Sequence, residues 1–412
     1  MKKCTGELQK DGGKPGKEMK ILVACVDMLP QNFRRQPWYY MNSLAQGLLN
    51  RGHDVWILTN KQSNQSKISF PVILENYRYF SVGINKEIIP LIKKEEFDVI
   101  IWSLGLTDFF FKNNIDILKI PVIAVVTSPR YFLGELLTLG KEWYYNNWYL
   151  RQLALGPFIS KRRIKGFLKL SNLKAIVFQC QLTRNRYISG GFGLNKTYIV
   201  PPPLPEEFLK VLKGEQTNKF ECNKVNFRVL YLGPPLTHRG LDTLIHAMSK
   251  VTNQMNNIEL YILSRIEDDQ LLNDEHKMRN LIKKKGIAAH THIISGLLSP
   301  EEIAKHILCS DVVCLPFKFV VSDVPLVILE TIALGVPIIT TERVGVAEFV
   351  KDNKGIIVPP GNHEALANSL IHIIKNRKGK SSRRSFDESF LSKFSLTKFV
   401  DSYERILSES LY

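Results

Sequence analysis

A single charged residue, Glu330, lies in the otherwise apolar stretch VPLVILETIALGVPIITT at residues 324–341. Sealing an unpaired charge in an apolar interior costs several kcal/mol even after the surroundings relax. The carboxylate is therefore expected to have a cationic partner, to reach solvent or to hold a ligand. The residues around it and elsewhere in the chain decide among these three.

The residues that precede Glu330 favour a ligand. Asp323 or Val324 is expected to cap a helix, and Pro325 suits its first position. Backbone N–H groups near 324–327 would then face a cleft and could bind an anion such as a diphosphate. Glu330 lies about one and a half turns further on, where it could accept hydrogen bonds from the hydroxyls of a ribose. The pattern predicts a nucleotide as its partner.

A second loop, LGPPLTHRGLDTLIHAM, has residue types suited to an anion. A predicted strand ends at Gly233 and a helix opens after Arg239, so N–H groups, a helix dipole and a guanidinium could converge on a phosphate. Strand–Gly–helix turns are also common for steric reasons alone. His238 is expected to be an ordinary residue, with a phosphate contact as the alternative.

The elements that must position these residues alternate between strand and helix. Apolar runs predict strands at 20–26, 53–60, 98–103, 121–127, 174–179, 197–202, 228–233, 258–264, 291–295, 311–317, 337–341 and 355–360. Helical periodicity predicts helices at 39–52, 240–251, 273–286, 300–309, 325–335, 363–376 and 394–412. Ser299, Pro300 and Glu302 predict a capping box at the helix that begins at 300. Such alternation is typical of parallel sheets covered by helices.

The chain of 412 residues is too long for one ordinary core, so two α/β domains are expected. The predicted units are a polar N-terminal tail (1–18), a first domain (19–206), a linker (207–226), a second domain (227–392) and a terminal helix (393–412). Ligands bind at the carboxyl ends of strands in such sheets. In the first domain this rule selects Asp27, Arg34, Arg35, Ser103, Asp108, Ser128, Arg130 and Tyr131, none of which is chosen as a base. His53 precedes a strand and is expected to be structural.

Composition fits a soluble globular chain, with 44% hydrophobic and 23% charged residues. No apolar run approaches the roughly 18–20 residues that cross a bilayer, and the polar start lacks the apolar core of a signal peptide. The six cysteines contain no C-x-x-C pair and are widely scattered. We expect them to be small core residues in a reducing cytoplasm.

Positive charge is concentrated in the first half: residues 1–213 carry a net charge of +15, and residues 214–412 one of +2. Residues 151–200 hold ten basic residues and no acidic one, directly after the Trp- and Tyr-rich EWYYNNWYLRQ. Basic residues beside aromatic ones predict attachment of the 141–170 region to an anionic membrane surface. A solvated basic face is the alternative, and nucleic acid is the least favoured partner.

Residues 228–376 resemble the C-terminal domain of the retaining GT-B glycosyltransferases of family four. The resemblance lies in the order and spacing of YLGPPLTHRGLDTLIHA, SGLLSPEEIAKHILCSDVVCLPF, SDVPLVILETIALGVPIITT, GVAEFV, GIIVPPGN and ALANSLIHII. It implies an α/β GT-B fold, in which two Rossmann-like domains face a central cleft and the last helix crosses back to the first domain. It also implies a nucleotide-sugar donor and no cofactor or catalytic metal.

Residue roles follow from the same resemblance. The family has two glutamates separated by seven residues, which correspond here to Ser322 and Glu330, with Asp323 following the first position. Glu330 is thereby implied to bind the donor ribose, and Ser322 or Asp323 to contact the sugar. The second residue of the family's basic pair is Arg239, and the first is Pro234 here. Arg265, which ends the next predicted strand, is either the replacement for this missing charge or a surface residue. The implied donor site is Gly233, Arg239, Arg265, Val324, Pro325, Leu326 and Glu330, with Arg239, Glu330, Ser322 and Asp323 as its catalytic part.

The function expected is transfer of a sugar, with retained anomeric configuration, to a lipid-linked or cell-envelope glycan acceptor at the cytoplasmic membrane face. Asp27, Ser103, Asp108, Ser128 and Arg130 are the expected acceptor-side residues. The chemistry would rest on electrostatic stabilisation of the departing diphosphate. Two alternatives stay open: a GT-B sugar-nucleotide epimerase, and a catalytically inactive binding or regulatory subunit.

Overall fold

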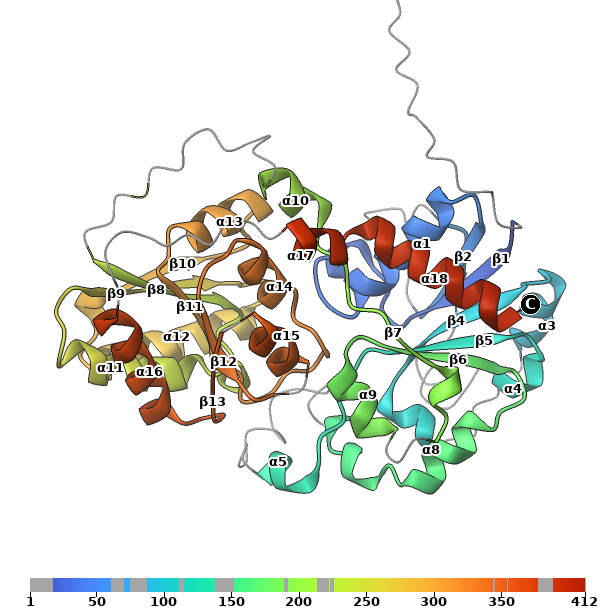
Figure 1. The fold of residues 1–412 in the computed structure, drawn as a ribbon, viewed down its shortest axis with the longest axis horizontal. Coiled ribbons are helices and arrows are strands. Elements are labelled where there is room, and N and C mark those ends of the chain that lie inside the picture. Colours follow the sequence, from blue (N-terminus) through green and yellow to red (C-terminus); the bar gives the residue numbers. More distant parts are fainter. Residues whose placement is uncertain are drawn as a thin grey trace, which may run out of the picture.

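The computed structural model describes residues 18–60, 70–74, 87–110, 115–137, 152–188, 192–212, 222, 226–343, 345–353, 355–376 and 388–411. Within them the chain forms two α/β domains, each built on one parallel sheet (Figure 1). The first sheet has seven strands and the second has six. The predicted fold of two Rossmann-like domains is confirmed.

The first sheet has the order β3-β2-β1-β4-β5-β6-β7, and all its pairings are parallel. Its strands are β1 (Lys20–Ala24), β2 (Asp54–Thr59), β3 (Val72–Leu74), β4 (Val99–Leu104), β5 (Val122–Val126), β6 (Leu173–Phe178) and β7 (Thr197–Ile199). Its α-helices are α1 (Trp38–Asn50), α3 (Ile89–Lys94), α4 (Ile115–Leu118), α5 (Leu133–Leu137), α8 (Lys161–Leu168), α9 (Gln181–Tyr187) and α10 (Glu206–Leu212). Short 3-10 turns are η1 (Pro30–Asn32), η2 (Leu106–Phe109), η3 (Gly156–Phe158) and η4 (Leu194–Lys196).

The second sheet has the order β10-β9-β8-β11-β12-β13, again all parallel. Its strands are β8 (Phe227–Gly233), β9 (Ile258–Ser264), β10 (Thr291–Ser295), β11 (Val312–Leu315), β12 (Ile338–Thr341) and β13 (Ile356–Val358). The helices are η5 (Thr237–Arg239), α11 (Leu241–Thr252), α12 (Asp269–Lys284), η6 (Ala288–His290), α13 (Pro300–Leu308), α14 (Leu326–Ala333), α15 (Val346–Asp352), α16 (His363–Lys375), α17 (Glu388–Lys393) and α18 (Leu396–Leu411). Strand order reverses between β8 and β11, which is where such sheets bind ligands.

Each predicted strand is present, because strands covered on both faces read as nearly continuous apolar runs. The predicted capping box is present too: the Ser299 hydroxyl accepts from Glu302 N at 3.2 Å, and Ser299 N donates to Glu302 Oε2 at 2.7 Å. The elements that were not predicted are the short edge strand β3 and the helices α3, α4, α5, α8, α9, α10, α15 and α17. At α14 the prediction was one residue early, since Pro325 is the extended cap and the helix begins at Leu326.

The cysteine prediction is wrong for one pair. Cys222 and Cys309 form a disulfide, with Cα atoms 5.4 Å apart. They are 87 residues apart in sequence, and the pairing follows from the return of the predicted linker onto the second domain, where α10 packs against α13. Cys25, Cys180 and Cys314 are buried and unpaired, as expected, whereas Cys4 lies outside the described residues.

The terminal helix α18 packs against α1 of the first domain (Figure 1). The Tyr40 hydroxyl is 2.9 Å from that of Tyr403 and donates to Val200 O at 2.9 Å. The rings of Tyr40 and Phe399 meet edge to face at 4.9 Å. His53 also belongs to this interface, since its ring bonds Met19 N and Glu404. The histidine is buried and structural, as predicted.

No helix within the described residues is both long enough and apolar enough to span a bilayer.

The close packing of α1 on α18 can be tested with two helical glycines. A Cβ at Gly47 would collide with Val400 of α18, whereas a Cβ at Gly166 of α8 meets nothing within 4 Å. We expect Gly47→Ala to lower the free energy of unfolding by about 1–3 kcal/mol through overpacking. Gly166→Ala should raise it by about 0.5–1 kcal/mol, as alanine normally does in a helix. Thermal unfolding of both variants measures this, and equal effects at the two positions would contradict the docking of α18.

Candidate donor site at the carboxyl edges of the two sheets

The carboxyl ends of the strands in the two sheets face each other across the domain boundary. In the first domain, loops after β1, β5 and β6 contact the second domain. In the second domain, the contacting loops follow β9, β10, β11 and β12. Every one of these contacts is made by a segment that leaves the carboxyl end of a strand. The predicted cleft residues therefore lie on the two edges that meet.

Arg239 lies against the end of β8. Its guanidinium packs over Gly233, where a Cβ would come within 2.9 Å of Nη2, and it stacks 4.6 Å from the ring of Phe317. Gly233 has a φ of +134°, which a residue with a side chain rarely adopts. Desolvation lowers the pKa of Arg239. Its Nε is buried and has no hydrogen-bond partner among the described residues, so an anion could use this donor.

Arg265 follows β9, the strand paired with β8, and its N–H donates to Gly233 O at 3.2 Å. Desolvation lowers the pKa of Arg265 to about 10, an effect that the nearby charge of Arg239 increases. The two arginines thus share one corner of the sheet edge. Arg265 Nε lies 3.5 Å from Glu267 Oε1. The sequence singled out Arg265 as a possible second cation, and the structure brings it beside Arg239.

The Glu330 carboxylate is partly exposed, in the second turn of α14. Within the described residues the structure shows no hydrogen bond or ion pair to this carboxylate. Desolvation raises its pKa to about 7, and the charge of Arg34 from the first domain partly opposes the rise. The described residues thus supply no cation that pairs with the carboxylate. Of the three possibilities raised by the sequence, solvent and a ligand are the two that this environment leaves.

Asp323 does not face an open site. It has no exposed surface, and its carboxylate accepts hydrogen bonds from the Thr183 hydroxyl and, at 3.6 Å, from the Cys180 thiol, both in the first domain. Its N–H donates to Thr127 O at 3.1 Å. Desolvation raises its pKa to about 7. Ser322 beside it is partly exposed, so only Ser322 of this pair has surface to offer a sugar. Val324 and Pro325 are buried, and Leu326 is partly exposed.

The predicted acceptor-side residues are mostly engaged within the first domain. Asp27 has a left-handed backbone (φ +50°) and bonds Asn60 through both its N–H and its carboxylate. Ser103 is partly exposed and hydrogen-bonds Cys25. Asp108 is buried, caps η2 through Gly105 N at 2.7 Å, and has a pKa raised to about 7, mainly by desolvation.

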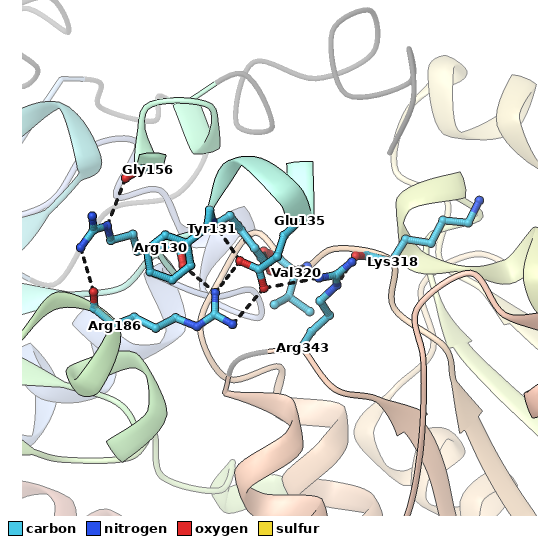
Figure 2. Close-up of polar contacts among 9 residues, drawn as sticks. Arg130, Tyr131, Glu135, Gly156, Arg186, Lys318, Val320 and Arg343 are labelled. Carbon is cyan, nitrogen blue, oxygen red and sulfur yellow. Dashed lines mark hydrogen bonds and ion pairs between the residues drawn. The ribbon is translucent and has the colours of Figure 1, made fainter. Parts of the chain in front are cut away.

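Arg130 also differs from the expectation, whereas nothing in the structure contradicts the expectation for Ser128. The Arg130 guanidinium is buried and donates to the carbonyls of Gly156 and Arg186 (Figure 2). It also donates to the carbonyl of Ile159. It therefore holds the first domain together instead of reaching into a cleft. Ser128 is partly exposed, and its carbonyl accepts from the Tyr187 hydroxyl at 3.1 Å.

A polar network joins the domains near Arg130. Glu135 of α5 accepts two hydrogen bonds from Arg186, at 2.7 and 2.9 Å, and lies 3.5 Å from Arg343 of the second domain (Figure 2). Arg343 in turn donates to Lys318 O at 2.6 Å. The Tyr131 hydroxyl donates to Val320 O at 2.9 Å. Nothing in the local sequence around Glu135 or Arg343 indicated these partners, because they come from separate domains.

His238 is buried, and desolvation lowers its pKa to about 3. It is neutral at physiological pH and contributes its backbone carbonyl, which accepts from Lys318 and Phe319. A cavity of about 300 Å³ lies nearby, lined by Asp242, Thr243, His246, Lys318, Pro360, Gly361 and His363. It contains none of the residues predicted to bind the donor.

Comparisons with known proteins match parts of the chain to glycosyltransferases. Residues 213–389 match the family described as Glycosyl transferases group 1. An uncharacterized glycosyltransferase of Methanocaldococcus jannaschii is 27% identical over 150 residues, which are 36% of this chain and 34% of that protein. The GDP-mannose-dependent alpha-(1-6)-phosphatidylinositol monomannoside mannosyltransferase of Mycobacterium tuberculosis is 24% identical over 211 residues, 49% of this chain and 53% of the relative. The alignments thus span about a third to a half of these relatives.

Solved structures match over nearly the whole chain. A glycosyltransferase from Rickettsia africae superimposes with a TM-score of 0.64 at 15% identity, covering 96% of this chain and 99% of that one. HepE from Anabaena, in complex with UDP and glucose, gives a TM-score of 0.62 at 14% identity, covering 95% and 100%. The chain has the GT-B fold, and its residues 213–389 match the Glycosyl transferases group 1 family.

Proposed function

We propose that this chain is a retaining glycosyltransferase that moves a sugar from a nucleotide-sugar donor to a lipid-linked or cell-envelope glycan acceptor. The observation that carries the proposal is the Glu330 carboxylate, desolvated and without a bond to the described protein, on the sheet edge that also bears Arg239 and Arg265. A ribose would supply hydroxyl donors for the Glu330 carboxylate, and a diphosphate would supply negative charge for Arg239 and Arg265. Relatives of known substrate agree, since one uses GDP-mannose and HepE binds UDP and glucose.

The proposed mechanism does not require a catalytic base from the first domain, where the acceptor is expected to bind. Arg239 and Arg265 stabilise the charge that develops on the departing diphosphate, in a partly desolvated place where electrostatic interactions are strong. The departing diphosphate takes the acceptor proton on the same face of the sugar, which retains the anomeric configuration. No catalytic metal or cofactor is part of the proposal. Asp108, the buried carboxyl of the first domain, caps η2 and is not assigned as a base.

An inactive binding subunit is the second candidate, and one observation favours it. Ser322 stands where the resembling family has its first glutamate, and the neighbouring Asp323 is turned into the domain boundary. The sugar end of the site therefore has no carboxylate from this motif. Turnover separates the candidates, because a binding subunit would bind donor and release no product.

Membrane attachment is part of the proposal. Phe132, Leu133 and Leu137 at α5 and Phe158 of η3 are 45–70% exposed. The two segments touch, because Gly156 packs on the Tyr131 backbone. The basic residues of α8 follow directly, and α5 and α8 lie along the same edge of the first domain (Figure 1). Residues 141–151 of the predicted region lie outside the described residues. The cytoplasmic face is proposed because that leaflet has the negative surface potential.

Replacing Glu330 should separate its functional role from a structural one. The folded-state pKa is raised from 4.5 to about 7, so the ionised form weakens stability as the pH rises through this window. Glu330→Gln should therefore unfold at a higher temperature than wild type at pH 8, by the equivalent of about 1–3 kcal/mol, with the difference vanishing near pH 4.5. The variant should bind UDP-glucose or GDP-mannose about 10–100-fold more weakly in calorimetry. Lower stability with unchanged donor affinity would show a structural residue instead.

Turnover tests the proposed activity. With a panel of sugar nucleotides and a lipid-phosphate acceptor, wild type should release nucleoside diphosphate, and the product's anomeric proton should show the donor's configuration by NMR. Arg239→Gln should lower kcat by about 100-fold or more, as loss of one charge-stabilising donor does. Arg51→Gln is the matched control, since Arg51 pairs with Asp401 on the α1–α18 side. Equal losses in both variants, or an inverted product, would contradict the mechanism.

Vesicle binding tests the membrane surface. Leu137→Ser and Phe158→Ser together should weaken binding to phosphatidylglycerol-containing vesicles about 10-fold or more, because each removes an exposed apolar side chain worth about 1 kcal/mol when partly inserted. Leu91→Ser removes an exposed leucine from α3 of the same domain and should have no effect. Equal binding of neutral and anionic vesicles would argue against the role of the basic residues.

A further inference from the structure

The segment after β1 reaches from the first domain onto the donor side of the second. Arg34 Nη2 donates to Leu298 O at 3.2 Å, in the loop after β10. Arg35 forms a two-nitrogen ion pair with Glu267, in the loop after β9, with Nε 3.1 Å from Oε1. Both contacts join the domains, and both are made by neighbouring arginines. The second is made to the acidic residue that also approaches Arg265.

Positive charge exceeds negative charge at this corner. Arg35 and Arg265 share one oxygen, Oε1 of Glu267, and Arg239 is close enough to lower the pKa of Arg265 further. Within the described residues no carboxylate forms an ion pair with Arg239. Three guanidinium groups therefore meet one carboxylate. The Glu267 side chain is only 15% exposed, whereas those of Arg35 and Arg265 are 32% and 37% exposed, so water offsets part of this imbalance.

Two of the arginine nitrogens have no good partner. Nε of Arg239 and Nε of Arg265 are both buried without a hydrogen bond among the described residues. The 3.5 Å from Arg265 Nε to Glu267 is longer than a normal hydrogen bond. Buried donors are rarely left in this state unless an ordered water or a ligand completes them. A diphosphate offers several anionic oxygens and twice or more the charge of a carboxylate, and guanidinium groups bind it in pairs.

We propose that Arg35 is a donor-binding residue supplied across the cleft by the first domain, which exchanges the Glu267 carboxylate for the donor's diphosphate. In this structure Glu267 acts as the internal counterion that the phosphate oxygens replace. Arg34 positions the exchange by anchoring the segment to Leu298. The inference rests on the proposed function, because it assigns a further residue to the same donor site. The assignment predicts that the interdomain contact and donor binding are coupled, since the Arg35 side chain takes part in both.

The alternative is a plain interdomain latch, in which the Arg35–Glu267 pair only holds the domains together. The two roles predict different directions for the change in anion affinity when each residue of the pair is replaced. If the pair is a latch, Arg35→Gln and Glu267→Gln remove the same interaction and change anion affinity in the same direction. If Arg35 serves the diphosphate, removing its charge weakens anion binding, whereas removing the competing carboxylate strengthens it.

Calorimetry on the full chain tests this with UDP, GDP and inorganic pyrophosphate as probes. We expect Arg35→Gln to weaken binding of the tightest probe about 10-fold and Glu267→Gln to tighten it about 3–10-fold. The double variant should lie between the two single variants. Arg51→Gln removes an arginine from an exposed ion pair away from the cleft and should leave binding unchanged. Melting temperatures of all variants without probe report whether each one folds.

Two outcomes overturn the inference, and they differ from failure of the proposed function. The first outcome is that Arg35→Gln and Glu267→Gln change the affinity for the probe in the same direction. The second is that Arg35→Gln leaves the affinity unchanged while Arg239→Gln lowers it. Either outcome removes Arg35 from the donor site but does not contradict the donor site itself. Wild type that binds none of the three probes contradicts the donor site itself.

Discussion

A buried carboxylate, Asp323, fixes the geometry on which the donor site depends. It lies two residues before the Pro325 cap of α14 and is anchored to the first domain by Thr183, Cys180 and the Thr127 carbonyl. The start of α14, and with it the direction of Glu330, is thus set by contacts across the domain boundary. A Cβ at Gly345 would collide with Asp323 O, so this close approach also requires a glycine at that position.

A second carboxylate strengthens the same junction. Glu348, in the first turn of α15, accepts from Gln181 N at 3.1 Å and Leu182 N at 2.7 Å, the N–H groups that open α9. Backbone donors at a helix start have no partner within their own helix, so an acceptor from the other domain satisfies them. Asp323 and Glu348 together join the second domain to the start of α9. Desolvation raises the pKa of Asp323 to about 7. Burial therefore destabilises the ionised carboxylate, and the hydrogen bonds from Thr183 and Cys180 offset only part of this effect.

The sequence was sufficient for the two α/β domains and for every strand except β3. Parallel strands buried on both faces are visible as apolar runs, and the family resemblance offered Arg265 as a replacement for the missing basic residue, which the structure places beside Arg239. Asp323 was misjudged because its partners come from the other domain, about 140 residues away. Arg130 follows a strand and was expected in the cleft, but three carbonyls of its own domain use its guanidinium. The Cys222–Cys309 pairing likewise depends on how the linker folds back.

The two groups of interdomain contacts differ in burial, and therefore in how much each contributes to holding the domains together. On the α9 side, Asp323 and Tyr131 are fully buried, and losing their partners would leave desolvated polar groups, at about 1–3 kcal/mol each. On the donor side, the Arg35 side chain is 32% exposed, and a partly hydrated ion pair of this kind contributes about 1 kcal/mol or less. The weaker contacts, those of Arg34 and Arg35, are thus on the side of Arg239 and Arg265. The stronger contacts are on the side where Asp323 holds the start of α14 and so positions Glu330.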